Sequence, residues 1–182
     1  KSDLEELVNK TLIAFQNYSR PSFLIEQNIA KHSLTTIADV LIATNKTTKD
    51  VITDVCYLDL STSESAADGK NRIINEAKSK EYTHLVIVED DVIIHKVEAI
   101  HKYIELMKKY ELGTIFFGFG GLSNQVFRKP NPRLILKVSD EERLFFNCMP
   151  CSAFQVFDVE KTMLFDPILK YLEMKEYLSR MN

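Results

Sequence analysis

Three consecutive acidic residues, Glu89-Asp90-Asp91, directly follow the apolar run Leu85–Val88. A short apolar run without alternation is typical of a central strand that is covered on both faces. In open α/β sheets, ligands bind outside the carboxyl ends of such strands. Three like charges at that edge repel one another, and a bound divalent cation relieves the repulsion. The segment therefore predicts a metal site that faces a phosphorylated ligand. The alternative is a polar end to the strand, whose acids simply face water.

The elements that must position these acids follow from the distribution of apolar residues. Short apolar runs alternate with segments of helical periodicity, which is typical of an α/β domain with a mostly parallel sheet. Strands are predicted at residues 11–15, 38–43, 55–60, 84–88, 114–119, 134–138 and 153–157. Helices are predicted in a polar leader at 2–10, after Ser19-Arg20-Pro21, after a cap at Asp68, at 97–107 with Gly113 closing it, and from Asp166 to about Arg180. The pattern indicates four strand–helix alternations followed by a less regular, mixed half.

The composition is that of one globular domain. The chain has 182 residues, of which 45% are hydrophobic and 27% charged, and this length favours a single core. A net charge of −3 supplies no cationic field for nucleic-acid binding. No apolar run reaches the roughly 18 residues that a membrane span requires. The three cysteines, an odd number, argue against a disulfide framework.

An ordered set of segments resembles the nucleotide-sugar-dependent glycosyltransferases of the GT-A fold (family 2-like). Gly69-Lys70-Asn71, the apolar strand and Glu89-Asp90-Asp91 are similar to the family's helix with a basic–Asn pair, its central strand and its D-x-D motif, which EDD often replaces. Tyr18-Ser19-Arg20-Pro21 resembles its Tyr-Asn-Arg-Pro turn, and Phe165-Asp166 with the segment 173–180 resembles its FD…ED-x-D-x-x-x-R segment. The resemblance covers residues 11–180 in order.

The fold implied by this resemblance is α/β and GT-A-like, that is, Rossmann-like. A mostly parallel central sheet would be flanked by helices, with a smaller mixed half on the acceptor side. Residues 1–112 would form the nucleotide-sugar-binding half and residues 113–182 the acceptor-side half of a single catalytic domain. This interpretation leaves open that the domain is part of a longer protein.

The resemblance also implies roles for individual residues. Asp91 would coordinate Mn²⁺ or Mg²⁺ bridging the two phosphates of the donor. Asp90 would contact the ribose or assist through a water molecule, and Glu89 would stand at the end of the strand. The other donor contacts would come from Phe15, Gln16, Arg20, Asn45, Lys70 and Asn71. Glu173 or Glu176 would be the general base that deprotonates the acceptor hydroxyl in a single inverting displacement.

One departure from the family's pattern affects the catalytic base. Glu173-Met174 stands where the family has Glu-Asp, so the acid usually credited as base is missing from its own position. Either Glu173 or Glu176 would have to replace it. The alternative is a solvated helix face on which Glu176 pairs with Arg180, four residues further on.

The expected function is metal-dependent transfer of a hexose-type sugar from a nucleotide sugar, a UDP-sugar, to a glycan, lipid-linked or other hydroxyl acceptor, as in polysaccharide biosynthesis. The expected location is cytoplasmic, and peripheral association with the inner face of a membrane stays open. A non-catalytic GT-A-like module that binds a nucleotide sugar or a glycan is the main alternative. A haloacid-dehalogenase-like phosphatase is more distant, because its D-x-D-x-T motif needs an aspartate nucleophile where Glu89 stands.

Overall fold

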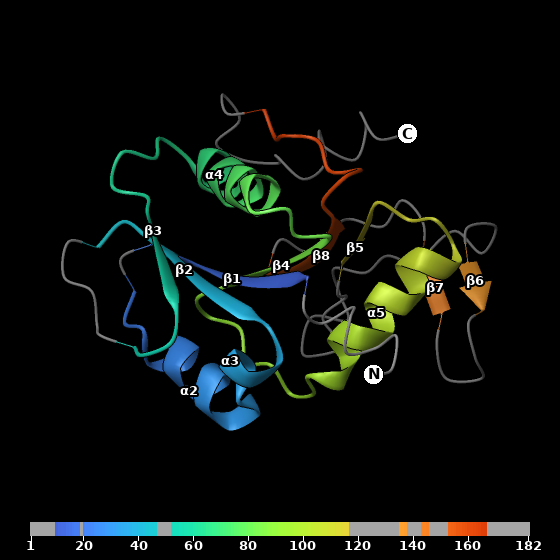
Figure 1. The fold of residues 1–182 in the computed structure, drawn as a ribbon, viewed down its shortest axis with the longest axis horizontal. Coiled ribbons are helices and arrows are strands. Elements are labelled where there is room, and N and C mark those ends of the chain that lie inside the picture. The colour runs from blue at the N-terminus through green and yellow to red at the C-terminus, as the bar shows by residue number, and fades with distance from the viewer. Residues whose placement is uncertain are drawn as a thin grey trace, which may run out of the picture.

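The computed structural model describes residues 10–18, 20–46, 52–116, 135–137, 143–145 and 153–166. Its centre is a six-stranded sheet of order β3-β2-β1-β4-β8-β5 (Figure 1). These strands are β1 (Thr11–Asn17), β2 (Asp39–Thr44), β3 (Cys56–Asp59), β4 (His84–Glu89), β5 (Thr114–Phe116) and β8 (Phe154–Asp158). The helices are α2 (Phe23–His32), α3 (Leu34–Ile37), α4 (Ala66–Ser79) and α5 (Glu98–Lys109). A separate antiparallel pair consists of β6 (Ile135–Lys137) and β7 (Arg143–Phe145).

The sheet combines a parallel part with one reversed strand. Strands β3, β2, β1 and β4 are parallel neighbours, whereas β8 runs antiparallel to both β4 and β5. The order β3-β2-β1-β4 is that of a Rossmann-like half, in which the chain changes direction across the sheet between β1 and β4. The predicted α/β class, with a mostly parallel sheet between helices, is confirmed. Strands β5 and β8, from the predicted acceptor-side half, complete this central sheet.

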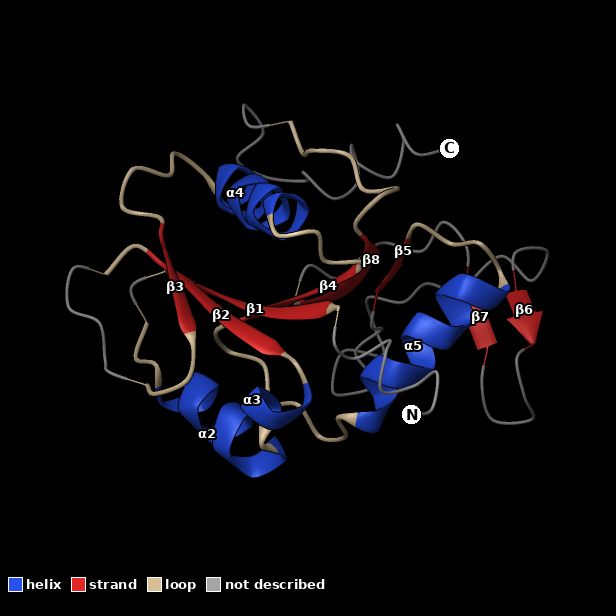
Figure 2. Ribbon diagram, in the orientation of Figure 1, coloured by secondary structure: helices blue, strands red, loops and turns tan. Residues whose placement is uncertain are grey.

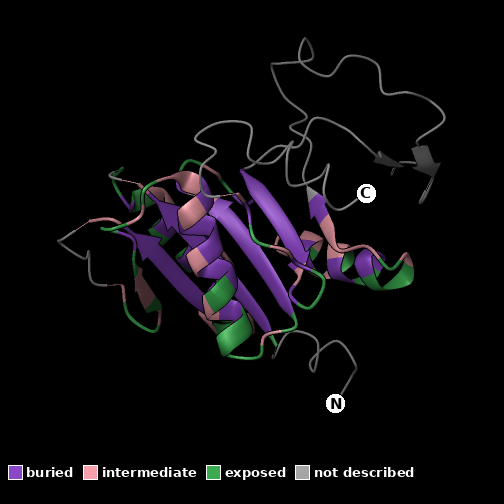
Figure 3. Ribbon diagram, turned by 90° about the horizontal axis from the view of Figure 1, so that it is seen from above, coloured by how far each residue is buried: buried purple, intermediate pink, exposed green. Residues whose placement is uncertain are grey.

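Helices cover both faces of the sheet. Helices α2, α3 and α5 lie on one face, and α4 lies on the other (Figure 2). Side chains alternate accordingly, so that Phe15 and Val88 pack with α2 and α5, while Ala14 and Ile87 pack with α4. Residues 84–88 are all buried, as expected for a strand covered on both faces (Figure 3).

The ends of three helices differ from the sequence prediction. Helix α2 begins after Ser22, which leaves Arg20 in the preceding loop. The N-cap of α4 is Ser65, whose hydroxyl accepts the Asp68 N–H at 3.1 Å, while Asp68 Oδ2 accepts the N–H of Glu64 at 3.3 Å. Helix α5 ends at Lys109, before the left-handed Glu111 (φ 54), and Gly113 therefore precedes β5 without capping the helix.

Two predicted helices lie outside the described residues. They are the leader at 2–10, of which only Lys10 is described, and the segment from Asp166 to Arg180, of which only Asp166 is described. Among the helices in the described part of the chain, none combines the length and apolar character needed to cross a membrane.

Candidate functional site

The predicted acidic site lies where β1 and β4 end side by side. Gln16 is paired in register with Glu89, so the loops after both strands leave the sheet at the same edge. The backbone N–H of Tyr18 donates to Asp90 Oδ2 at 3.1 Å. The guanidinium of Arg20 donates from Nη1 to Asp90 Oδ1 at 3.2 Å and also to Asp91 Oδ2. Arg20, in the loop after β1, therefore contacts both aspartates, which directly follow β4.

The two aspartates differ in accessibility. The side chain of Asp90 is 8% exposed and that of Asp91 is 52% exposed. Burial raises the pKa of Asp90, whereas the Tyr18 N–H and the Arg20 charge lower it. The hydrogen bond to Asp91 raises the pKa of Arg20. Both oxygens of Asp90 are used within the protein, so Asp90 joins the two loops, and Asp91 is the aspartate that faces solvent.

The loop that carries the acids is held from beneath by α2. Asn28, which is buried, donates from Nδ2 to the carbonyl of Val92 at 2.7 Å and accepts the N–H of Ile94 at 2.8 Å. His32 Nε2 lies 2.6 Å from the carbonyl oxygen of Ile94. Sequence analysis missed Asn28. The available signal is that Asn28 lies on the same helix face as the apolar residues Ile25 and Ile29.

The start of α4 packs closely against the end of β1. Gln16 Nε2 donates to the carbonyl of Ala66 and to the Tyr18 hydroxyl, each at 3.1 Å, and that hydroxyl donates to the carbonyl of Ser65 at 3.1 Å. A Cβ at Gly69 would lie 2.0 Å from the Tyr18 hydroxyl oxygen and 2.7 Å from Gln16 Nε2, so a larger residue here would displace these two side chains. The side chain of Gln16, predicted to contact the nucleotide, is thus part of the packing between β1 and α4.

Lys70 and Asn71 are buried on α4 against the chain segment that follows β8. Asn71 Nδ2 donates to the carbonyl of Phe165 at 2.9 Å, and Asn71 Oδ1 accepts the N–H of Phe165 at 2.7 Å. The ammonium of Lys70 lies 5.6 Å from the centroid of the Phe165 ring. The two residues predicted to lie near the ribose and phosphates therefore contact Phe165.

The structure distributes the other predicted site residues as follows. Phe15 is fully buried in the core on the α2 side of the sheet, so its side chain does not reach the edge where the acids lie. Glu89 is the last residue of β4, and Asn45 directly follows β2. Both lie at the carboxyl edge of the sheet, and both are half-buried. The predicted bases Glu173 and Glu176 lie outside the described residues.

One further residue at this edge was missed from the sequence. Asn17, the last residue of β1, is 1% exposed, and its Oδ1 has no hydrogen-bond partner among the described residues. Buried polar atoms are almost always paired, so the partner of this acceptor is water, a ligand or a part of the chain outside the described residues. Asn17 lies directly before Tyr18, where the loop after β1 leaves the sheet.

The donor set is compatible with a hard divalent cation. Within the described residues, no group of three or more His, Cys, Asp or Glu could hold a metal ion. Mg²⁺ sites often use only one or two carboxylates and complete their coordination with water and substrate phosphates. The exposed Asp91, with Glu89 two residues before it, fits that kind of site and not an all-protein cage, and a cation there would take the place of Arg20 at Asp91 Oδ2.

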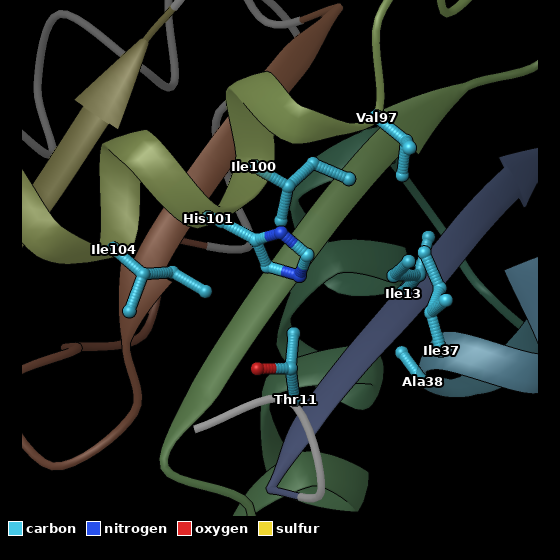
Figure 4. A pocket seen from close by; sticks show the side chains of 8 residues that line it. All are labelled: Thr11, Ile13, Ile37, Ala38, Val97, Ile100, His101 and Ile104. Atoms are coloured by element: carbon cyan, nitrogen blue, oxygen red, sulfur yellow. The ribbon is translucent and has the colours of Figure 1, made fainter. Parts of the chain in front are cut away.

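A small pocket lies at the opposite end of β1 from the acids (Figure 4). It is lined by Thr11, Ile13, Ile37, Ala38, Val97, Ile100, His101 and Ile104. Its lining is mostly apolar and contains no acidic group that could hold a cation. The acidic edge therefore remains the candidate site.

Comparison with known proteins adds no assignment. No protein-family model matches the chain, and no curated protein matches it significantly.

Proposed function

We propose that the protein is a metal-dependent glycosyltransferase that moves a sugar from a UDP-sugar to a hydroxyl acceptor. The observation that carries this proposal is the cluster of Asp90, Asp91 and Arg20 at the edge between β1 and β4. In open α/β sheets this is the position at which nucleotide ligands bind. The resemblance of the motifs in the sequence supports the same function.

Each charged residue of the cluster has a distinct part in this proposal. Asp91 would hold the cation, with Glu89 beside it, because Asp91 is the exposed aspartate. When bound, the cation neutralises charge that develops on the leaving diphosphate. Arg20 is 57% exposed and offers charge-assisted hydrogen bonds to phosphate oxygens. Asp90 keeps both loops in place through Tyr18 and Arg20.

The acceptor side needs a base to remove the hydroxyl proton. We keep Glu173 and Glu176 as the candidates for this role. Positioned proton transfer of this kind contributes about 10²–10⁴-fold to a rate. The non-catalytic alternative makes the same nucleotide contacts but releases no product, so turnover separates the two.

Calorimetric titration of UDP tests the proposal. Binding is expected with Mn²⁺, and it should be lost with EDTA or with Asp91→Asn. The control variant is Glu105→Gln, which removes one charge from an exposed acid on α5 and should bind like wild type. Equal binding of UDP by Asp91→Asn and by wild type would refute the site. If wild type binds none of UDP, GDP and CDP, the function is refuted. Nucleotide binding without hydrolysis of UDP-glucose, UDP-galactose or UDP-N-acetylglucosamine would favour the binding module.

A further inference from the structure

The segment 162–166 returns along α4 toward the acidic edge. Strand β8 is antiparallel to β4, and so it ends at the opposite edge, where Asp158 pairs with His84. From there the chain passes Lys78, whose Nζ donates to the carbonyl of Thr162 at 2.7 Å, and then reaches Asn71 at Phe165. Because α4 begins at the carboxyl edge of the sheet, this path runs in the direction of the candidate site.

The spacing of these contacts indicates an extended path. Lys78 and Asn71 are seven residues apart on the helix, which corresponds to about 10 Å along its axis. Three extended residues from Thr162 to Phe165 span about the same distance. The segment therefore runs antiparallel to α4 with an anchor at each end.

The anchor at Phe165 is the stronger one. The Asn71 amide satisfies both the N–H and the C=O of Phe165, as a neighbouring strand would. The Phe165 ring is 2% exposed and packs edge-on against Phe157, with centroids 6.5 Å apart. The ammonium of Lys70 faces the same ring. Asp166 follows directly, and it is half-buried at this end of α4.

We infer that Asn71 is a positioning residue that fixes Phe165 and Asp166 on α4, where the chain runs toward the edge at which the nucleotide binds, without contacting the nucleotide itself. The inference rests on the proposed function. It assigns Asn71 a different role from the donor contact expected from the sequence, because both atoms of its amide already serve the Phe165 backbone. The acids proposed as base follow Asp166 in the chain, so loss of the anchor should impair turnover and spare donor binding.

Amide hydrogen exchange tests the anchor in the 182-residue chain. With Asn71→Ala, the Phe165 amide should exchange at least about tenfold faster, while amides of β1 and β4 keep their protection. Asn75→Ala is the matched control, since Asn75 is an exposed asparagine one helical turn further along α4. If Asn71→Ala fails to fold, Asn71→Asp replaces it, because it keeps the acceptor and loses only the donor.

Binding and turnover then test the role. The affinity of the variant for UDP with Mn²⁺ should stay within about threefold of wild type, and kcat with the most active of the three UDP-sugars should fall about 10- to 100-fold. Unchanged protection of Phe165, a large loss of UDP affinity, or wild-type kcat would each overturn the inference. If wild type binds no UDP, the proposed function fails, and the exchange measurement still decides whether Asn71 anchors the segment.

Discussion

Replacing Gly69 with alanine tests the contact between α4 and the end of β1. The new Cβ would lie 2.0 Å from the Tyr18 hydroxyl oxygen and 2.7 Å from Gln16 Nε2, so Tyr18 must move by more than about 1 Å. Overpacking of this kind costs about 1–3 kcal/mol, and loss of the bond from Tyr18 to Ser65 costs about 1 kcal/mol more. Alanine regains about 1 kcal/mol of helix propensity. The free energy of unfolding should therefore fall by about 2 kcal/mol.

Urea unfolding measures this difference, since the midpoint shifts at constant slope when only stability changes. Asn75→Ala separates helix propensity from packing, because Asn75 is exposed on the same helix and its replacement should raise stability by about 0.5 kcal/mol. A Gly69→Ala protein that is as stable as wild type, or more stable, would show that α4 does not approach Tyr18 this closely.

Two further outcomes concern charged groups. Asp90→Ala should lower the free energy of unfolding by about 2–3 kcal/mol, because it leaves the Tyr18 N–H without its acceptor and takes from Arg20 one of its two carboxylate partners. Thermal unfolding should show a change of no more than about 0.5 kcal/mol for the exposed Asp91→Ala, and equal effects would contradict the different burial of the two aspartates. Burial lowers the pKa of His84 below its ordinary value of 6.5, so the unfolded chain takes up a proton more readily than the folded protein, and stability should fall as the pH drops below about 6.5. Denaturant midpoints between about pH 7.5 and 5 should decrease less in His84→Gln, and parallel curves for both proteins would refute this linkage.

Local patterns were sufficient to predict the parallel part of the central sheet and the place of the acids. The run Leu85–Val88 is apolar without alternation, and it forms the strand that is buried on both faces. The acids at its end lie at the predicted edge, because the carboxyl ends of parallel strands all lie at the same edge of a sheet. Arg20, which was expected to contact the donor, lies beside these acids through its contacts to Asp90 and Asp91, and its role toward a donor stays a prediction.

Contacts distant in the sequence could not be predicted in the same way. Asn71 and Phe165 are 94 residues apart, and Asn28 and Ile94 are 66 residues apart. Periodicity can place an asparagine on a buried helix face, as for Asn28, but it does not identify the partner, because the partner is a backbone group in an irregular segment. The burial of Phe15 was also not predicted. Its position in the alternation of β1 places its side chain in the core, whereas the motif alone suggested a ligand contact.

The reversed strand β8 also governs when this sheet can be completed. Strand β5 pairs only with β8 in the described residues, and β8 covers the outer side of β4. During synthesis, the parallel strands β3, β2, β1 and β4 are therefore available long before residue 154 emerges, with the edge of β4 unpaired. An open edge of a hydrophobic strand invites pairing with other chains. We expect the nascent chain to be most prone to aggregation after β4 has emerged and before β8 has been inserted.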